Sequence, residues 1–156
     1  MSQVVAAVEA VFSDAGALAQ SVPEYVPRVG QIQMAHAVAE TMETGGTLVV
    51  EAGTGIGKTY AYLVPSLLSG HKVLISTATK ALQDQLFGRD IPAVIAMLKS
   101  PARVALLKGR SSYLCLHRLT NARHDGMLQT AAPLRLLGQV EQWAVSTRFG
   151  DVAEVP

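Results

Sequence analysis

A glycine-rich stretch in the first half of the chain constrains the fold more than any other feature. From Leu48 to Tyr60 an apolar run is followed by a loop with three glycines and then by Lys58 and Thr59. Glycine reaches positive φ without steric cost, so such a loop can turn several backbone N–H groups inward, and a helix that follows adds its positive N-terminal end. The pattern is typical of the phosphate-binding loop G-x-x-x-x-G-K-[ST], with Ala52 in the first glycine position.

Each position of this loop has a chemical role in the prediction. The Lys58 ammonium places a charge on the β- and γ-phosphates of a nucleotide, and the Thr59 hydroxyl coordinates Mg²⁺. The alternative is a turn that merely joins a strand to a helix. The apolar run before the loop and the helical spacing after it favour nucleotide binding. The backbone around the phosphates comes from Gly53, Thr54, Gly55, Ile56 and Gly57.

Bulk properties set the class of protein. The chain has 156 residues, 49% of them hydrophobic, which suffices for one sizeable core. Its net charge is +1, but ten of the 13 basic residues lie between residues 61 and 135. A single cysteine excludes an internal disulfide and favours a reducing, cytoplasmic location. We expect no membrane partner, because we find no apolar run of membrane-spanning length in the sequence. Residues 1–20 contain no Lys or Arg, so the charged start of a secretory or transit peptide is not expected there.

The order of elements predicts an α/β fold with a parallel sheet and flanking helices. Residues 47–50 and 72–76 are expected to be buried strands separated by a helix over 57–68 that carries Pro65, in βαβ order. A third strand is expected at 104–107. Apolar spacing predicts further helices over 3–18, from 31 to 42, after Lys80, over 91–98 and over 131–145, whereas residues 147–156 show no pattern.

Two groups of polar residues are candidates for contacts with nucleotide or nucleic acid. Gln31 offers one amide donor and one acceptor, which match N6 and N7 of adenine, although a glutamine near a helix start is more often a solvated cap. Thr77, Thr79 and Gln83 follow the second predicted strand and suit phosphate oxygens of a nucleic-acid strand. Ordinary helix capping by the two threonines is the alternative.

The second half of the chain is basic and holds the only cysteine. Seven bases against one acid between residues 99 and 135 favour a polyanion partner, with a solvated basic face as the alternative. Cys115 is either a buried inert thiol or one ligand of a metal centre. Its spacing to His117 and His124 does not match a zinc site, and one thiolate cannot hold a cluster by itself.

Four segments, 25–31, 50–63, 76–86 and 107–116, resemble in order the N-terminal part of the DinG/YoaA helicases, the XPD-like branch of superfamily 2. The similarity runs from about residue 24 to 120. It implies a RecA-like P-loop fold, in which Ala at the position of Ala52 is common. It makes Gln31 with Arg28 an adenine-recognising Q-motif, and residues 76–85 a segment that touches single-stranded DNA. It also makes Cys115 the first of four cysteine ligands of a 4Fe–4S cluster.

By implication the whole enzyme uses ATP to move 5′→3′ along single-stranded DNA and to unwind duplex DNA in repair. Its expected partners are single-stranded or forked DNA, with accessory repair or replication proteins possible. The expected division is an N-terminal helix and linker (1–23), the first half of the ATP-binding domain (24–110) and the truncated start of an iron–sulfur insertion (111–156). No predicted strand in this sequence ends in Asp-Glu, so the Walker B carboxylates that hold Mg²⁺ and position the attacking water are not found. The piece alone is therefore expected to bind nucleotide weakly, hydrolyse little and assemble no cluster. The competing hypotheses are a non-catalytic nucleotide- or DNA-binding module and a small-substrate P-loop kinase.

Overall fold

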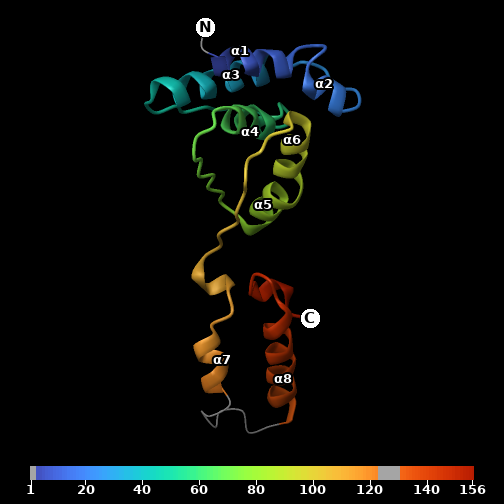
Figure 1. Cartoon of the computed structure of the whole chain (residues 1–156), viewed down its shortest axis with the longest axis vertical. Helices are drawn as coiled ribbons and strands as arrows, with labels where there is room; N and C mark the ends of the chain where they lie inside the picture. The colour runs from blue at the N-terminus through green and yellow to red at the C-terminus, as the bar shows by residue number, and fades with distance from the viewer. Residues whose placement is uncertain (1–2, 123–130) are drawn as a thin grey trace. The chain divides into compact units, whose positions relative to one another are not determined.

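The computed structural model describes residues 3–122 and 131–156, and the chain divides into two compact units, Met1–Ala105 and Leu106–Pro156 (Figure 1). The first unit contains α1 (Gln3–Phe12), α2 (Ala17–Ser21), α3 (Val29–Thr44), α4 (Lys58–Leu68), α5 (Lys80–Gln85), the π turn η1 (Leu86–Asp90) and α6 (Ile91–Leu98). The second contains the 3₁₀ turn η2 (Arg110–Ser112), α7 (Leu116–Ala122), α8 (Ala131–Ser146) and the 3₁₀ turn η3 (Val152–Glu154). The predicted domain boundaries after residues 23 and 110 stay predictions.

The N-terminal segment forms two helices where one was predicted. The first helix ends at Phe12, and the chain then turns back so closely that a Cβ on Gly16 would lie 2.3 Å from the carbonyl oxygen of Ala10. Only glycine fits that approach. By length and apolarity alone, Gln3–Ser21 could cross a membrane, which corrects the prediction that no stretch reaches that length. In the structure its side chains Val8, Phe12 and Leu18 are buried in the core of the first unit.

The core of this unit is made by helices. α1 packs on α3 and α4, and α4 also packs on α6. The helix predicted from residue 31 to 42 is confirmed as α3, which stops at Thr44 before Gly45 at φ +77°. α4 runs through the buried Pro65. The helices predicted over 91–98 and 131–145 are also confirmed, as α6 and α8.

The three predicted strands are not formed. Within residues 3–122 and 131–156 there is no β-strand, only an isolated antiparallel bridge between Tyr113 and Asp151. The segments 47–50, 72–76 and 104–107 run without strand pairing, and Val49, Leu74 and Leu107 are 90%, 93% and 80% exposed. A strand needs a neighbouring strand for its N–H and C=O groups, and the described segments do not supply one another with that neighbour.

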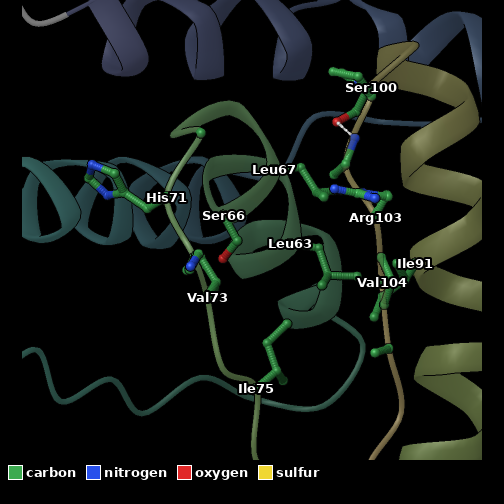
Figure 2. A pocket seen from close by; sticks show the side chains of 15 residues that line it. Leu63, Ser66, Leu67, His71, Val73, Ile75, Ile91, Ser100, Arg103 and Val104 are labelled. Atoms are coloured by element: carbon green, nitrogen blue, oxygen red, sulfur yellow. Dashed lines mark hydrogen bonds between the residues drawn. The ribbon is translucent and has the colours of Figure 1, made fainter.

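An open space separates two of these segments. A cavity of about 470 Å³ lies between α4 and residues 71–75 and 101–105. Figure 2 shows the two segments on either side of it, with Leu63 and Leu67 reaching in from α4 and Ile75 and Val104 coming from the segments. Its lining is largely apolar, and Val73, Ile75 and Val104 of the segments predicted as strands line this space without a paired strand beside them.

Candidate nucleotide-binding site

The glycine-rich loop adopts left-handed backbone at two of its three glycines. Gly55 has φ +80° and Gly57 has φ +88°, and Gly57 is the residue that caps the N-terminus of α4. Gly53 is not at positive φ, and a Cβ there would meet only the Ile56 side chain, at an ordinary 3.6 Å. The predicted conformational freedom is therefore used at Gly55 and Gly57 but not at Gly53. The loop ends at the helix N-terminus where phosphate is bound in other proteins.

Two side chains from the start of α3 hold this loop. The Arg28 guanidinium donates from Nη1 to the carbonyl oxygen of Gly55. Gln31 donates from Nε2 to the carbonyl oxygen of Gly57 at 3.0 Å. Since α3 packs directly on α4, both donors are fixed against the helix that the loop begins. These contacts bring together the two motifs, 26 or 27 residues apart, that the sequence predicts to act on one nucleotide.

Gln31 is buried and engaged at both ends of its amide. Its side chain is 5% exposed, so the alternative of a solvated helix cap is wrong. The Tyr25 hydroxyl donates to Gln31 Oε1 at 3.4 Å, while Nε2 lies only 2.2 Å from the position that a Cβ on Gly57 would take. The sequence predicts Gln31 as a site residue but does not predict that Tyr25 is its hydrogen-bond partner. Tyr25 stands six residues before Gln31 in a proline-flanked segment, which was the one available signal.

Lys58 and Thr59 lie where the motif predicts, at the start of α4. Lys58 Nζ donates to the carbonyl oxygens of Ala52 at 2.8 Å and Gly53 at 2.7 Å, so its ammonium is held within the loop. Burial raises the pKa of Tyr62, and the Thr59 side chain acts on that pKa in the opposite direction. Lys58 and Thr59 are both half-buried, and the carbonyl partners of Lys58 are groups that phosphate oxygens can replace.

A small cavity lies beside the phosphate loop that Arg28 and Gln31 hold. Its volume is about 330 Å³, at the lower end of the range for small-molecule sites. Two aromatic rings line it, Tyr25 and Tyr60, together with Arg28, Gln31 and the apolar side chains of Leu18 and Val22. Burial raises the pKa of Tyr25. Arg28 and Gln31 therefore touch both the cavity and the phosphate loop, and a planar base in the cavity would lie next to the loop that holds its phosphates.

The three residues predicted to contact nucleic acid lie around the start of α5. Thr79 caps this helix by accepting from the backbone N–H of Leu82 at 3.2 Å, and Thr77 Oγ1 donates to the carbonyl oxygen of Thr79 at 3.2 Å. Gln83 lies one turn further and is half-buried. The capping alternative therefore holds for Thr79. Contact of these residues with DNA stays a prediction.

The predicted cluster ligand stands alone. Cys115 is exposed, and it is the only cysteine of the sequence. Within 3–122 and 131–156 no group of three or more His, Cys, Asp or Glu side chains could hold a metal ion. His124, with the basic residue Arg123, lies outside the described residues. The residues present do not fit a cluster that needs four cysteine ligands.

Loop, lysine, threonine and helix N-terminus together define a P-loop nucleotide-binding site. Comparison with protein families matches residues 31–134 to the DEAD/DEAH box helicases, and this chain belongs to that family. The fold implied is the RecA-like P-loop fold, although its sheet is not formed by the described residues.

The chain is similar over most of its length to individual proteins named YoaA and DinG. The chain is 46% identical over 144 residues to the ATP-dependent DNA helicase YoaA of Haemophilus influenzae, covering 92% of this chain and 22% of that protein. It is 49% identical over 145 residues to YoaA of Escherichia coli, covering 91% and 22%. It is 37% identical over 143 residues to the 3′-5′ exonuclease DinG of Bacillus subtilis, covering 89% and 15%. The chain thus spans about a fifth of the length of the two YoaA helicases.

Proposed function

We propose that this chain is the ATP-binding part of an ATP-dependent DNA helicase of the DinG/YoaA type. The observation that carries the proposal is the pair of hydrogen bonds that Arg28 and Gln31 donate to the phosphate loop, which we call the brace. Arg28 and Gln31 contact the carbonyl groups of Gly55 and Gly57 and also line the adjacent aromatic cavity. One short helical segment therefore contacts both the place for a base and the place for its phosphates. Such an arrangement couples recognition of the base to the shape of the loop.

Adenine selection is assigned to Gln31. Its amide presents a donor and an acceptor at the end of a fixed, buried side chain, and a bidentate pair with adenine is worth about 1–3 kcal/mol in discrimination where it has been measured on DNA. In this structure these groups bond to Gly57 and Tyr25. When an adenine enters the cavity, hydrogen bonds from the Gln31 amide to the edge of the base replace part of its bonding to Gly57 and Tyr25. The rings of Tyr25 and Tyr60, which line the cavity, offer apolar surface to the base.

The triphosphate is assigned to the loop and Lys58. Backbone N–H groups around Gly55 and the N-terminus of α4 favour negative charge, and Gly57 allows the close turn that presents them. Lys58 would exchange the carbonyl oxygens of Ala52 and Gly53 for phosphate oxygens, which form stronger, charge-assisted bonds. Mg²⁺, when bound with the nucleotide, neutralises phosphate charge, and the Thr59 hydroxyl is the residue here that would hold it.

The finer parts of the proposal concern DNA. Thr77, Thr79 and Gln83 are placed together around the start of α5, where they could contact phosphates of a single strand. We include in the proposal the 5′→3′ direction, a role in repair on single-stranded or forked DNA with accessory proteins, and a cytoplasmic location. A 4Fe–4S cluster would need three cysteine ligands besides Cys115 that the sequence does not contain, so no step of the proposal is routed through it.

The named activities of the relatives favour placing the shared function in nucleotide binding. Two relatives are named helicases and one an exonuclease, yet each matches about nine tenths of this chain. The part common to all three therefore contains the phosphate loop and its brace, whatever the rest of each protein does. A non-catalytic nucleotide- or DNA-binding module is the competing function.

The test measures ATP turnover with and without single-stranded DNA in the full-length protein that carries this chain. We expect at least a tenfold stimulation by DNA, and loss of turnover in Lys58→Ala. Lys72→Ala is the matched control, because Lys72 is exposed and lies outside the loop. Nucleotide binding without turnover would establish the module instead, and turnover that DNA does not stimulate would remove the helicase function.

A further inference from the structure

A buried ion pair joins the two ends of the second unit. Lys108 Nζ donates to Asp151 Oδ2 at 2.6 Å, across 43 residues of chain, and the two side chains are only 7% and 9% exposed. Removing one partner of such a pair leaves a buried charge without compensation, which is strongly unfavourable. Surface ion pairs, by contrast, contribute little. Loss of either partner alone is therefore expected to disturb how residues near Lys108 and Asp151 are held together.

Backbone hydrogen bonds surround the pair. The Lys108 N–H donates to the Tyr113 hydroxyl at 2.8 Å, and the Leu114 N–H donates to the carbonyl oxygen of Gly150 at 2.8 Å. Tyr113 and Asp151 form an antiparallel bridge. Asp151 also accepts from the Ala153 N–H through Oδ1 at 3.1 Å, so its two carboxylate oxygens have different partners. We call Lys108, Tyr113, Leu114, Gly150 and Asp151 the base clamp.

The base clamp joins the two ends of the chain segment that contains α7 and α8, and we call this segment the excursion. The clamp also forms one wall of a cavity. α7 and α8 pack on each other between its two halves. A cavity of about 580 Å³ is lined by Arg110, Cys115 and Arg118, which lie near the Lys108 end of the clamp in the chain, and by Val152, which follows Asp151. These groups come from chain segments that the clamp joins, so the clamp contributes to where the Cys115 thiol lies relative to Val152.

We propose that Lys108 and Asp151 are positioning residues that close the base of the excursion and thereby fix Cys115 within this cavity. The inference rests on the second unit alone and not on the proposed nucleotide-binding function. Neither residue carries a signal in the sequence for this role, since they lie far apart in the chain and Asp151 belongs to a tail without periodicity. The structure brings them within hydrogen-bonding distance.

The first test measures amide hydrogen exchange in the 156-residue chain at Leu114, whose N–H bonds across the clamp to Gly150. Lys108→Met and Asp151→Asn should each accelerate this exchange by about 100-fold or more, as expected when a buried pair loses one charge. The Thr147 N–H, which bonds to Trp143 at the end of α8, serves as the internal control. It should change by no more than about threefold.

The second test removes both charges. In Lys108→Met/Asp151→Asn neither charge of the pair remains, and the introduced side-chain amide can still accept from the Ala153 N–H. Exchange at Leu114 should then be slower than in either single variant, which is the non-additivity that a coupled pair requires. Ser112→Ala is the matched control in the same unit, because Ser112 is 1% exposed and its Oγ has no hydrogen-bond partner within the described chain. It should leave Leu114 unchanged within about threefold.

The third test measures the position of Cys115 directly. Since this is the only cysteine, Glu154→Cys on the exposed turn η3 gives one spin-label pair across the cavity. We expect a single narrow distance distribution when the clamp is intact and a broad one in Lys108→Met and Asp151→Asn. The proposal is overturned if the single variants keep the narrow distance distribution. It is also overturned if hydrogen exchange at Leu114 in the double variant is as fast as the two single effects combined. Equal acceleration at Thr147 and Leu114 would overturn it too, because the ion pair would then hold the whole unit and not its base.

Discussion

The helices of the first unit and the two apolar segments between them, 47–50 and 72–76, differ in how completely they are formed. α4 buries Leu63 and Val64 almost fully, whereas Val49 and Leu74 in the predicted strands face solvent. The two kinds of segment are similarly apolar, so hydrophobicity does not explain the difference. A helix satisfies its backbone hydrogen bonds within itself, but a strand requires a partner chain segment.

The comparison shows what holds the nucleotide site together. The phosphate loop is fixed by α3 and α4, through Arg28, Gln31 and the helix start at Lys58, and not by a paired strand before it. The loop can therefore have its left-handed glycines and its side-chain brace while residues 47–50 remain unpaired. The following substitutions separate the contribution of the helices from that of the extended segments.

The largest effect is expected from comparing two leucines. Leu63→Ala removes a side chain that is 1% exposed in α4 and should lower the free energy of unfolding by about 2–5 kcal/mol. Leu74→Ala, on a segment predicted as a strand, should change it by less than about 0.5 kcal/mol, because Leu74 is exposed. Urea unfolding followed by circular dichroism measures both. Equal losses would show that the extended segment is packed as well as the helix.

Two glycines of the loop provide the next comparison. Gly57→Ala places a Cβ at φ +88° and against the Gln31 amide, which should destabilise the chain by about 2–3 kcal/mol through backbone strain and the loss of a hydrogen bond. Gly53→Ala meets only an ordinary contact with Ile56 and should be nearly neutral. Unfolding midpoints of the two variants give the answer. A neutral Gly57→Ala would mean that the left-handed turn and the Gln31 contact are not required.

Two glutamines on α3 test the brace itself. Gln31→Ala removes the bonds to Gly57 and Tyr25 from a buried position and should cost about 1–3 kcal/mol of stability. Gln33→Ala alters the same residue type on the same helix at an exposed position and should cost less than about 0.5 kcal/mol. Denaturant titrations of both variants, side by side, measure the difference. Indistinguishable midpoints would remove Gln31 from the support of the loop.

The smallest effect is a dependence on alkaline pH. Burial raises the pKa of Tyr62 above its ordinary 10.0, so the folded state holds the phenol proton more tightly than the unfolded state does. The resulting stability is complete below about pH 10 and is lost as the pH rises through the folded-state pKa. Tyr62→Phe should therefore make the decline above about pH 10 shallower, as measured by thermal unfolding. An unchanged decline would contradict this assignment.

The sequence predicted the local features of the site but not the contacts between them. Helix boundaries around Gly45 and Gly57 and the identities of Lys58, Thr59 and Gln31 follow from spacing and glycine chemistry, which act over a few residues. The hydroxyl of Tyr25 on Gln31 and the ion pair of Lys108 with Asp151 are tertiary contacts without periodic signals. The strands were predicted from apolar runs, and they stay unpaired in the described residues because an apolar run specifies burial without supplying the partner strand.

We propose that Lys58 and the phosphate loop bind a nucleoside triphosphate and that Gln31 recognises its base. The most direct measurement is calorimetric titration of the 156-residue chain with Mg²⁺–ATP and Mg²⁺–GTP. We predict weak binding with preference for ATP, a loss of affinity of about 100-fold in Lys58→Ala, as expected for a charge-assisted phosphate contact, and loss of the ATP preference in Gln31→Ala. Equal affinity of the parent chain and Lys58→Ala for ATP would contradict the account.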